Sequence, residues 1–180
     1  MHPSISTSNG ATADQVPLTS LIGPAVVVDV TAKAARDSDY RLAVARPRRM
    51  GSRARPHPRG RDRADAERLG LALAGPQALP RDRPPGRRRE SALPGFSKEA
   101  AEWLVRERDV AAIGVDTPSI DHGPSRDFIV HQVVNGAGKP GLENVAHLER
   151  LPPIGATLIA LPMKIGGGSG APTRIVALLP

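Results

Sequence analysis

The sequence lacks several features that would point to particular classes of protein. It contains no cysteine, which excludes a disulfide scaffold and a thiolate metal site. It has no apolar run of the roughly 18 residues that a membrane helix needs, and its first residues do not show the charged-then-apolar layout of a signal peptide. We therefore expect a soluble, cytoplasmic protein with no membrane partner. Its 180 residues are enough for one domain of ordinary size.

Aromatic residues are also scarce, and the basic residues are unevenly distributed. Only 2% of the chain is aromatic, and the formal net charge is +7. Between Arg46 and Glu90 there are 14 Arg, no Lys and 5 acidic residues, so this quarter of the chain carries the whole basic excess. Taken as it stands, such a Pro-rich segment favours a disordered arm that binds nucleic acid. The absence of interleaved aromatics for base stacking argues against that function.

Outside this basic segment, the hydrophobic pattern is typical of a folded α/β protein. Four short apolar runs predict strands, at residues 25–30, 110–115, 158–161 and 174–179. Ser97 can cap one helix, and Ser125 with Asp127 can open another that Gly136 would end. Strands that alternate with helices indicate the α/β class. Within the basic segment only residues 64–74 could form a helix.

Two pairs of side chains could bind a metal ion. His131 and Glu143 lie twelve residues apart, and an imidazole with a carboxylate suits zinc or manganese. The alternative is a histidine satisfied within the core and a glutamate on the surface, which the spacing alone favours. Glu143 and His147 are four residues apart, so they would share one face if that stretch were helical. Chance pairs with this spacing are common.

Two further stretches could carry chemistry or could simply be turns. The sequence GVDTPSID, residues 114–121, follows a predicted strand, where polar side chains often line the site of an α/β fold. Asp, Thr, Pro and Ser are also ordinary turn residues. The run GGGSG, residues 166–170, could be mistaken for a phosphate loop. It lacks the following Lys-Ser/Thr and does not open a helix, so we interpret it as a flexible turn.

Most of residues 94–179 resembles the C-terminal half of the cyclase family of metal-dependent hydrolases, which includes the bacterial kynurenine formamidases. The matching stretches are PGFSKEAAEWL, AAIGVDTPSIDHGPSRDF, HQVVNGAGKPGLE with NVAHL, and LPPIGATLIALPMKIGGGSGAPTRIVAL. The segment GATADQVPLTSLIGPAVVVDVTAKAA is similar to an earlier strand region of the family. The resemblance implies an α/β fold of the swivelling β/β/α type, with a mixed β-sheet or barrel core and flanking helices. It also implies a homo-oligomer and a divalent-metal site.

The resemblance assigns roles to four residues. His131 and Glu143 match a His and a Glu of the family's metal site, which implies zinc, or alternatively manganese, as the cofactor. Asp116 and Ser119 are weaker candidates, for shaping the substrate site. The implied reaction is hydrolysis of N-formylkynurenine to kynurenine and formate in tryptophan breakdown. An alternative is a family member that acts on another substrate, a cyclic amide or imide. Residue patterns do not distinguish it from a formamidase.

The family's first metal motif, H-x-G-T-H-x-D-x-P-x-H, is absent. It should lie just before Gly10, where the chain reads MHPSISTSN. In a neighbouring reading frame, permitted codons for MHPSIS read APIHF, preceded by Asp if the upstream base is G, and DAPIHF matches the end of that motif. The missing motif would supply two His and an Asp for the primary metal, and the His that passes a proton to the leaving amine. No catalytic residue is therefore retained.

The basic segment can also be read as family-like sequence in a neighbouring frame. With permitted codon choices and one constant shift of frame, RPRRMGSRARPHP can read DLDAWEAEHGRIP. By the same shift, the stretch from Arg61 can read AIVLMRSGWGSRWPDRKRYLG and onward in family-like sequence. We hypothesise a frame-displaced translation bounded by compensating insertions or deletions, and a start at Met1 near a truncated 5′ end.

The chain would then be a single incomplete domain over residues 1–180. Its parts are an out-of-frame start (1–9), a strand region (10–45), a disordered Arg/Pro-rich segment (46–93) and the C-terminal half of the domain (94–180). Since a catalytic metal site normally uses three or more protein ligands, we expect weak metal binding and little activity from this chain.

Overall fold

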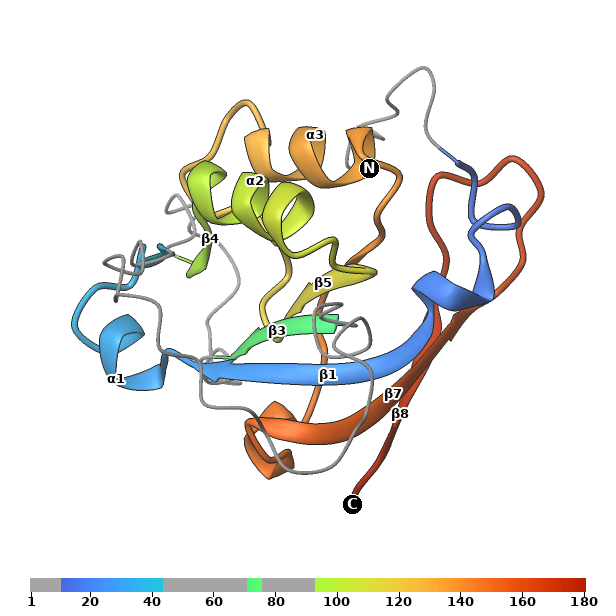
Figure 1. The fold of residues 1–180 in the computed structure, drawn as a ribbon. Coiled ribbons are helices and arrows are strands. Elements are labelled where there is room, and N and C mark those ends of the chain that lie inside the picture. Colours follow the sequence, from blue (N-terminus) through green and yellow to red (C-terminus); the bar gives the residue numbers. More distant parts are fainter. Residues whose placement is uncertain (1–10, 44–70, 76–92) are drawn as a thin grey trace, which may run out of the picture.

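A six-stranded sheet forms the centre of the protein. The computed structural model describes residues 11–43, 71–75 and 93–180, and the sheet has the strand order β6-β5-β3-β1-β7-β8 (Figure 1). The strands are β1 (Ile22–Asp29), β3 (Leu71–Gly75), β5 (Ala112–Val115), β6 (Gly141–Leu142), β7 (Ile154–Pro162) and β8 (Thr173–Leu178). The first four strands in this order run parallel, whereas β7 is antiparallel to both β1 and β8. A separate parallel pair consists of β2 (Arg41–Leu42) and β4 (Gly95–Phe96).

Two helices, α2 (Lys98–Glu107) and α3 (Ile129–Gly136), cover one face of the sheet (Figure 1). Helix α2 begins where the sequence predicts, because the Ser97 hydroxyl accepts a hydrogen bond from the backbone N–H of Ala100 at 3.1 Å. Helix α3 ends at Gly136, as predicted. The shorter helices are α1 (Thr31–Ala34), η1 (Leu18–Ser20) and η2 (Leu148–Arg150). No described helix is long and apolar enough to cross a membrane.

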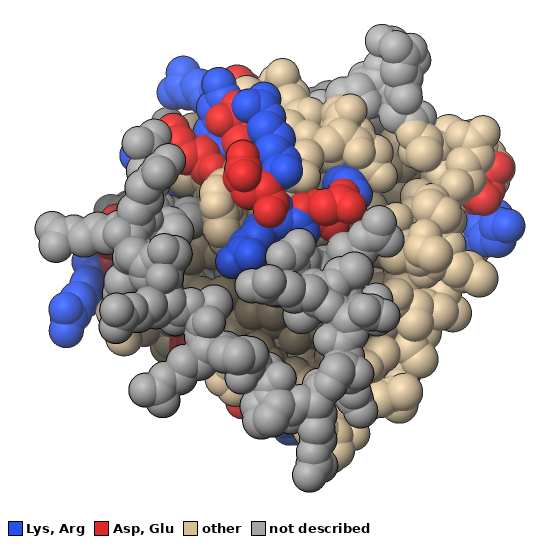
Figure 2. Space-filling view, in the orientation of Figure 1, with Lys and Arg blue, Asp and Glu red and all other residues tan. Residues whose placement is uncertain are grey.

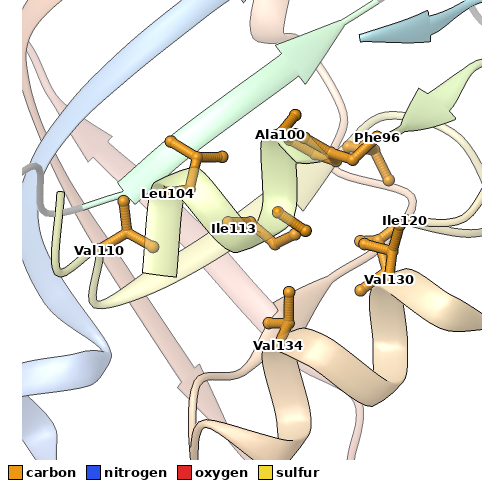
Figure 3. Close-up of a cluster of buried hydrophobic side chains, with 10 residues drawn as sticks. Phe96, Ala100, Leu104, Val110, Ile113, Ile120, Val130 and Val134 are labelled. Carbon is orange, nitrogen blue, oxygen red and sulfur yellow. The ribbon is translucent and has the colours of Figure 1, made fainter. Parts of the chain in front are cut away.

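Hydrophobic side chains pack on both faces of the sheet. One cluster fills the space between the sheet and helices α2 and α3 (Figure 3), and its largest members are Phe96, Leu104, Ile113, Ile120, Val130 and Val134. A second cluster contains Ala25, Ala112, Leu142, Val145, Leu148, Ala156, Leu158 and Ala160. Adjacent residues of a strand point to opposite faces, so Ala112 and Ile113 of β5 belong to different clusters. Burial of both faces explains why β5 is continuously apolar.

Charged side chains are unevenly distributed on the face of the molecule that Figure 2 shows. In Figure 2, Lys, Arg, Asp and Glu side chains gather at the upper left, over the helices, whereas the right-hand side carries few charges. Several large apolar side chains of β7, β8 and their connection are exposed: Ile154, Leu161, Met163, Ile165, Val176 and Leu178.

The predicted strands and the α/β class are confirmed. Each of the four predicted apolar runs contributes to a strand: β1, β5, β7 and β8. The described strands do not form a closed barrel, because β6 and β8 lie at the two open edges of the main sheet. The expected alternative of a barrel core is therefore corrected to an open mixed sheet.

The helix considered for residues 64–74 is wrong where the structure describes it. Leu71–Gly75 form strand β3, which pairs in parallel with β1 on one side and β5 on the other. A short apolar run without helical periodicity suits a central parallel strand, and the two neighbouring strands satisfy its backbone hydrogen bonds. The prediction of disorder for residues 46–93 is likewise wrong at Leu71–Gly75, which form β3. The predicted out-of-frame start and the rest of the 46–93 segment lie outside the described residues, apart from Leu93.

Candidate functional site

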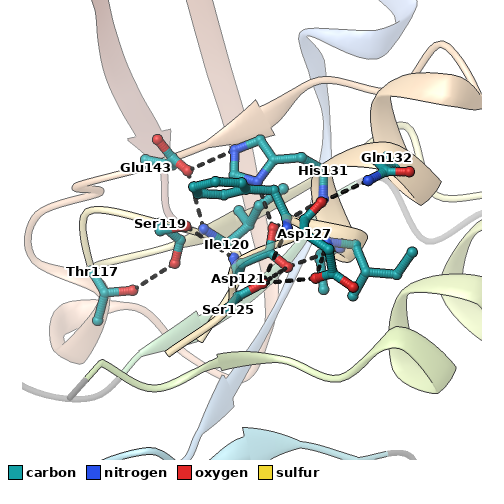
Figure 4. A network of polar contacts seen from close by, with 12 residues as sticks. Thr117, Ser119, Ile120, Asp121, Ser125, Asp127, His131, Gln132 and Glu143 are labelled. Carbon is teal, nitrogen blue, oxygen red and sulfur yellow. Dashed lines mark hydrogen bonds and ion pairs between the residues drawn. The ribbon is translucent and has the colours of Figure 1, made fainter. Parts of the chain in front are cut away.

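The His131 ring lies between two carboxylates in the first turn of α3 (Figure 4). Its Nδ1 atom is 2.6 Å from Oδ2 of Asp121, and its Nε2 atom is 3.2 Å from Oε1 of Glu143. The three residues come from different segments, namely the loop after β5, the start of α3 and the residue that follows β6. The fold thus places both metal-binding candidates, His131 and Glu143, side by side.

Asp121 is fixed by the start of α3. Its side chain is only 1% exposed, and its Oδ1 accepts the backbone N–H of Val130 at 2.9 Å. Its Oδ2 accepts the backbone N–H of His131 at 3.1 Å. The first N–H groups of a helix have no partner within the helix, so a carboxylate at this position satisfies them and matches the positive end of the helix dipole.

The loop that carries Asp121 is held by its own polar side chains and by β4. Ser119 Oγ accepts the backbone N–H of Asp121 at 3.1 Å. Thr117 Oγ1 can donate to the carbonyl of Ser119 at 3.1 Å or of Pro94 at 3.2 Å. The backbone N–H of Phe96 donates to the carbonyl of Ile120 at 2.9 Å. Ser119 therefore contacts the backbone of Asp121 within this loop.

Glu143 is oriented by the sheet and by the same loop. It follows β6, whose Gly141 and Leu142 pair with β5. Its Oε1 accepts the backbone N–H of Ile120 at 3.1 Å and also faces His131. The glutamate side chain is 32% exposed and the histidine side chain 21%, so this side of the pair can be reached from solvent.

The two carboxylates control the charge of His131. Burial by itself lowers the pKa of His131, but hydrogen bonding to Asp121 and Glu143 raises it to about 9. Burial in turn raises the pKa of Asp121, but hydrogen bonds from His131 and from the backbone of Val130 and His131 bring it below its ordinary value. The raised pKa therefore favours the protonated, cationic form of His131 at neutral pH.

Asp116 is the other site-shaping candidate. It follows β5 directly, and its buried Oδ1 has no hydrogen-bond partner. Burial raises its pKa to about 7, and the nearby charge of Glu149 adds to the shift. Among the described contacts, no hydrogen bond or ion pair joins Asp116 to His131 or Glu143.

Two other sequence interpretations are decided by the structure. Residues 143–147 are not helical, so the condition under which Glu143 and His147 would share a helical face is not met. His147 instead faces Glu149 at 3.4 Å. Residues 166–170 lie in the connection between β7 and β8, as a turn rather than a phosphate loop.

Sequence reasoning did not select Asp121 as a site residue. The available signal was an acidic residue inside the stretch 114–121, shortly before a predicted helix start, where carboxylates bind free backbone N–H groups.

His131 and Glu143 fit a divalent metal ion as two of its protein ligands. Imidazole nitrogen and carboxylate oxygen are suitable donors for zinc and manganese, and the two atoms that would bind face each other. The described part of the chain contains no group of three or more side chains that could hold a metal ion. Within the described residues, the pair by itself therefore falls short of a metal site.

Known proteins are similar to this chain in both sequence and fold. The sequence model of the family described as "Putative cyclase" matches residues 2–122. The chain is 34% identical over 167 residues to the kynurenine formamidase of Salinibacter ruber, covering 93% of the chain and 68% of that protein. It is 30% identical to the kynurenine formamidase of Paracidovorax citrulli, covering 95% of the chain and 69% of that protein.

Among solved structures, isatin hydrolase A from Labrenzia aggregata bound to benzyl benzoate is similar, with a TM-score of 0.73 and 27% sequence identity. The match covers 98% of this chain and 68% of that one. The family model, the sequence relatives and the structural similarity agree on one assignment. The chain belongs to the cyclase family.

Proposed function

We propose that this protein is a metal-dependent amide hydrolase of the kynurenine formamidase type. The observation that carries the proposal is the approach of His131 Nε2 to Glu143 Oε1, at 3.2 Å. This places an imidazole and a carboxylate together in a chain that is 34% identical to a kynurenine formamidase. The substrate would be N-formylkynurenine, and the products kynurenine and formate.

His131 and Glu143 would hold the metal ion, with zinc as the first candidate and manganese as the alternative. When bound, a divalent ion supplies Lewis-acid chemistry, by activating water and polarising the carbonyl of the scissile amide. His131 would give up its Nε2 proton to bind through that nitrogen. Glu143 would keep its orientation through the hydrogen bond from the Ile120 backbone N–H, at 3.1 Å. Asp116 and Ser119 would shape the surroundings of the site.

A cyclic amide is the second candidate substrate. The structural similarity to isatin hydrolase A, with a TM-score of 0.73, favours it specifically. Opening a cyclic amide and removing a formyl group from an aryl amine are both hydrolyses of a C–N bond. The same metal-binding pair could therefore serve either reaction.

We propose that the chain in its present sequence binds metal weakly and has little activity. Catalytic zinc sites normally use three or more protein ligands, whereas His131 and Glu143 supply two. Stoichiometric zinc in the purified chain, with hydrolysis of formylkynurenine at an ordinary enzymatic rate, would contradict this.

The function can be tested with the purified chain after removal of metal by a chelator. Zinc or manganese is added back, and hydrolysis of N-formylkynurenine and of isatin is followed side by side. We expect slow, metal-dependent hydrolysis of formylkynurenine that His131→Gln abolishes. His147→Gln is the matched control, because His147 is 65% exposed and faces Glu149 instead. Faster opening of isatin would favour the second substrate, and a rate that does not respond to metal would reject the proposal.

We also propose that residues 46–93 are a frame-displaced translation within this domain. The segment has a concentration of Arg and no aromatic residue, and permitted codons read in one shifted frame give family-like sequence. Resequencing the gene across the codons for residues 45–96 tests this directly, because compensating insertions or deletions should be found near both ends. An unchanged sequence would instead mean that the segment is genuine, and a salt-dependent DNA titration would then test it as a nucleic-acid-binding arm.

A further inference from the structure

We propose that Asp121 is a positioning residue, which fixes the ring of His131 so that Nε2 is the nitrogen available to the metal ion. The metal part of this inference rests on the proposed function. The placement of the ring does not, because it follows from contacts within the chain.

The contact between Asp121 and the ring decides which nitrogen keeps its proton. His131 Nδ1 lies 2.6 Å from Asp121 Oδ2. An ionised carboxylate can only accept hydrogen bonds, so Nδ1 must carry the hydrogen in this pair. Nε2 then remains as the nitrogen that can exchange its proton for a metal ion. A carboxylate behind the ring is the usual device that orients a metal-binding histidine.

Asp121 is itself held firmly enough to act in this way. Both of its oxygens accept backbone N–H groups at the start of α3, from Val130 at 2.9 Å and from His131 at 3.1 Å. Ser125 Oγ also lies 3.3 Å from Oδ1. Because one carboxylate binds both the backbone and the ring of His131, the orientation of the ring is tied to the start of the helix (Figure 4).

The variant Asp121→Asn should reverse the arrangement. If the new NH₂ group faces His131, it donates to Nδ1, which must then be the unprotonated nitrogen. The proton moves to Nε2 and blocks that atom as a metal ligand. If the amide is turned the other way, its NH₂ group meets the backbone N–H of Val130, and two donors face each other. Neither orientation restores the contacts that the carboxylate makes.

Asp127→Asn is the matched control. Asp127 also lies at the start of α3, where its Oδ1 accepts the backbone N–H of Ile129 at 3.3 Å. Replacing it with Asn changes the net charge by the same amount as Asp121→Asn. The described contacts of Asp127 do not include the ring of His131. A change that appears in Asp121→Asn but not in Asp127→Asn is therefore caused by the contact with the ring.

The experiment uses the full chain and two measurements. Nitrogen-15 NMR of the histidine rings, assigned with His131→Gln, follows the Nδ1 and Nε2 protons before and after addition of zinc. Calorimetry then gives the zinc affinity of each variant. We expect zinc to remove the Nε2 proton and leave the Nδ1 proton in place. We also expect Asp121→Asn to bind zinc about 10–100-fold more weakly than Asp127→Asn.

The proposal is overturned if zinc replaces the Nδ1 proton, or if both variants bind zinc equally well. If Asp121→Asn fails to fold, the parent chain and the Ser125→Ala variant still test the positioning role of Asp121. Both should show the Nδ1 proton held against exchange, and its absence from the parent chain would reject the positioning role. A parent chain that holds this proton but binds no zinc supports the positioning of the ring and contradicts the metal-dependent function, so the two failures are distinguishable.

Discussion

Gly95 lies directly against the backbone of Asp121. A Cβ atom at position 95 would come within 2.5 Å of both the Asp121 carbonyl carbon and the His122 nitrogen. The neighbouring residue, Phe96, forms a bridge with Asp121 and is 1% exposed. Strand β4 therefore packs against the loop that carries Asp121. The close approach of the two backbones at position 95 requires a residue without a side chain.

Gly95→Ala should destabilise the protein and displace Asp121. The added methyl group meets backbone atoms, which cannot rotate away, so we expect a loss of about 1–3 kcal/mol or more in the free energy of unfolding. Urea denaturation measures the loss. Gly136→Ala serves as the control, because a Cβ atom there has nothing within 4 Å. Equal stability of the two variants would contradict the tight contact.

Ser97→Ala should cost about 1 kcal/mol of stability, because it removes the side-chain cap of α2. Ser97 Oγ accepts the Ala100 backbone N–H at 3.1 Å and is buried, so water would not replace it fully. The change can be measured by thermal or urea denaturation. Ser38→Ala, at an exposed loop position, should be close to neutral. A loss no larger than that of the control would show that the cap contributes little.

The metal-free protein should lose stability as the pH rises towards 9. The pKa of His131 is raised from 6.5 to about 9 by Asp121 and Glu143. The native state therefore binds this proton more tightly than the unfolded state. The resulting stabilisation is fully present below about pH 6.5 and is lost as the pH passes through about 9. Urea denaturation with a chelator present, at several pH values, should show this slope.

His131→Gln should remove this part of the slope, whereas His147→Gln should retain it. The same proton competes with metal for Nε2, so zinc should bind more tightly as the pH increases over this range. A zinc affinity that does not change between pH 6.5 and 9 would contradict the assigned protonation.

Asp116→Asn should stabilise the protein above pH 7. Burial raises the pKa of Asp116 from 3.8 to about 7, so the native state holds this proton more tightly than the unfolded state does. Its contribution to stability falls as the pH rises from about 4 to about 7, and the neutral amide avoids that loss. The two chains should therefore be most similar near pH 4. Denaturation curves at pH 4 and pH 8 test this, with Glu107→Gln as an exposed control.

The sequence predicted the elements whose signals are local. The apolar run at 25–30 predicted a strand, and β1 does lie between β3 and β7 in the sheet. The predicted burial is wrong for most of the strand, since Ala25 is its one buried residue. Ser97 predicted the start of α2, because a helix cap depends only on neighbouring residues. The sequence predicted α3 but not its exact first residue. Phe128 adopts a left-handed conformation with φ 51°, and the helix begins after it.

The elements that depend on distant contacts were missed. Leu71–Gly75 become a central strand only because β1 and β5 lie on both sides. Asp121 and His131 are ten positions apart, and only the packing of α3 shows that the carboxylate binds the ring as well as the helix start. Spacing alone could pair His131 with Glu143, but it could not distinguish a metal site from a satisfied core histidine.

The strand order also determines when the sheet can be completed during synthesis. Ile22 of β1 pairs with Ile159 of β7, so the antiparallel half of the sheet must wait until most of the chain has left the ribosome. At roughly 5–20 residues per second, this delay is on the order of ten seconds. During that time β1 presents an unpaired, valine-rich edge, which other nascent chains could join. We therefore expect mispairing through the β7-facing edge of β1 to be greatest in the nascent chain.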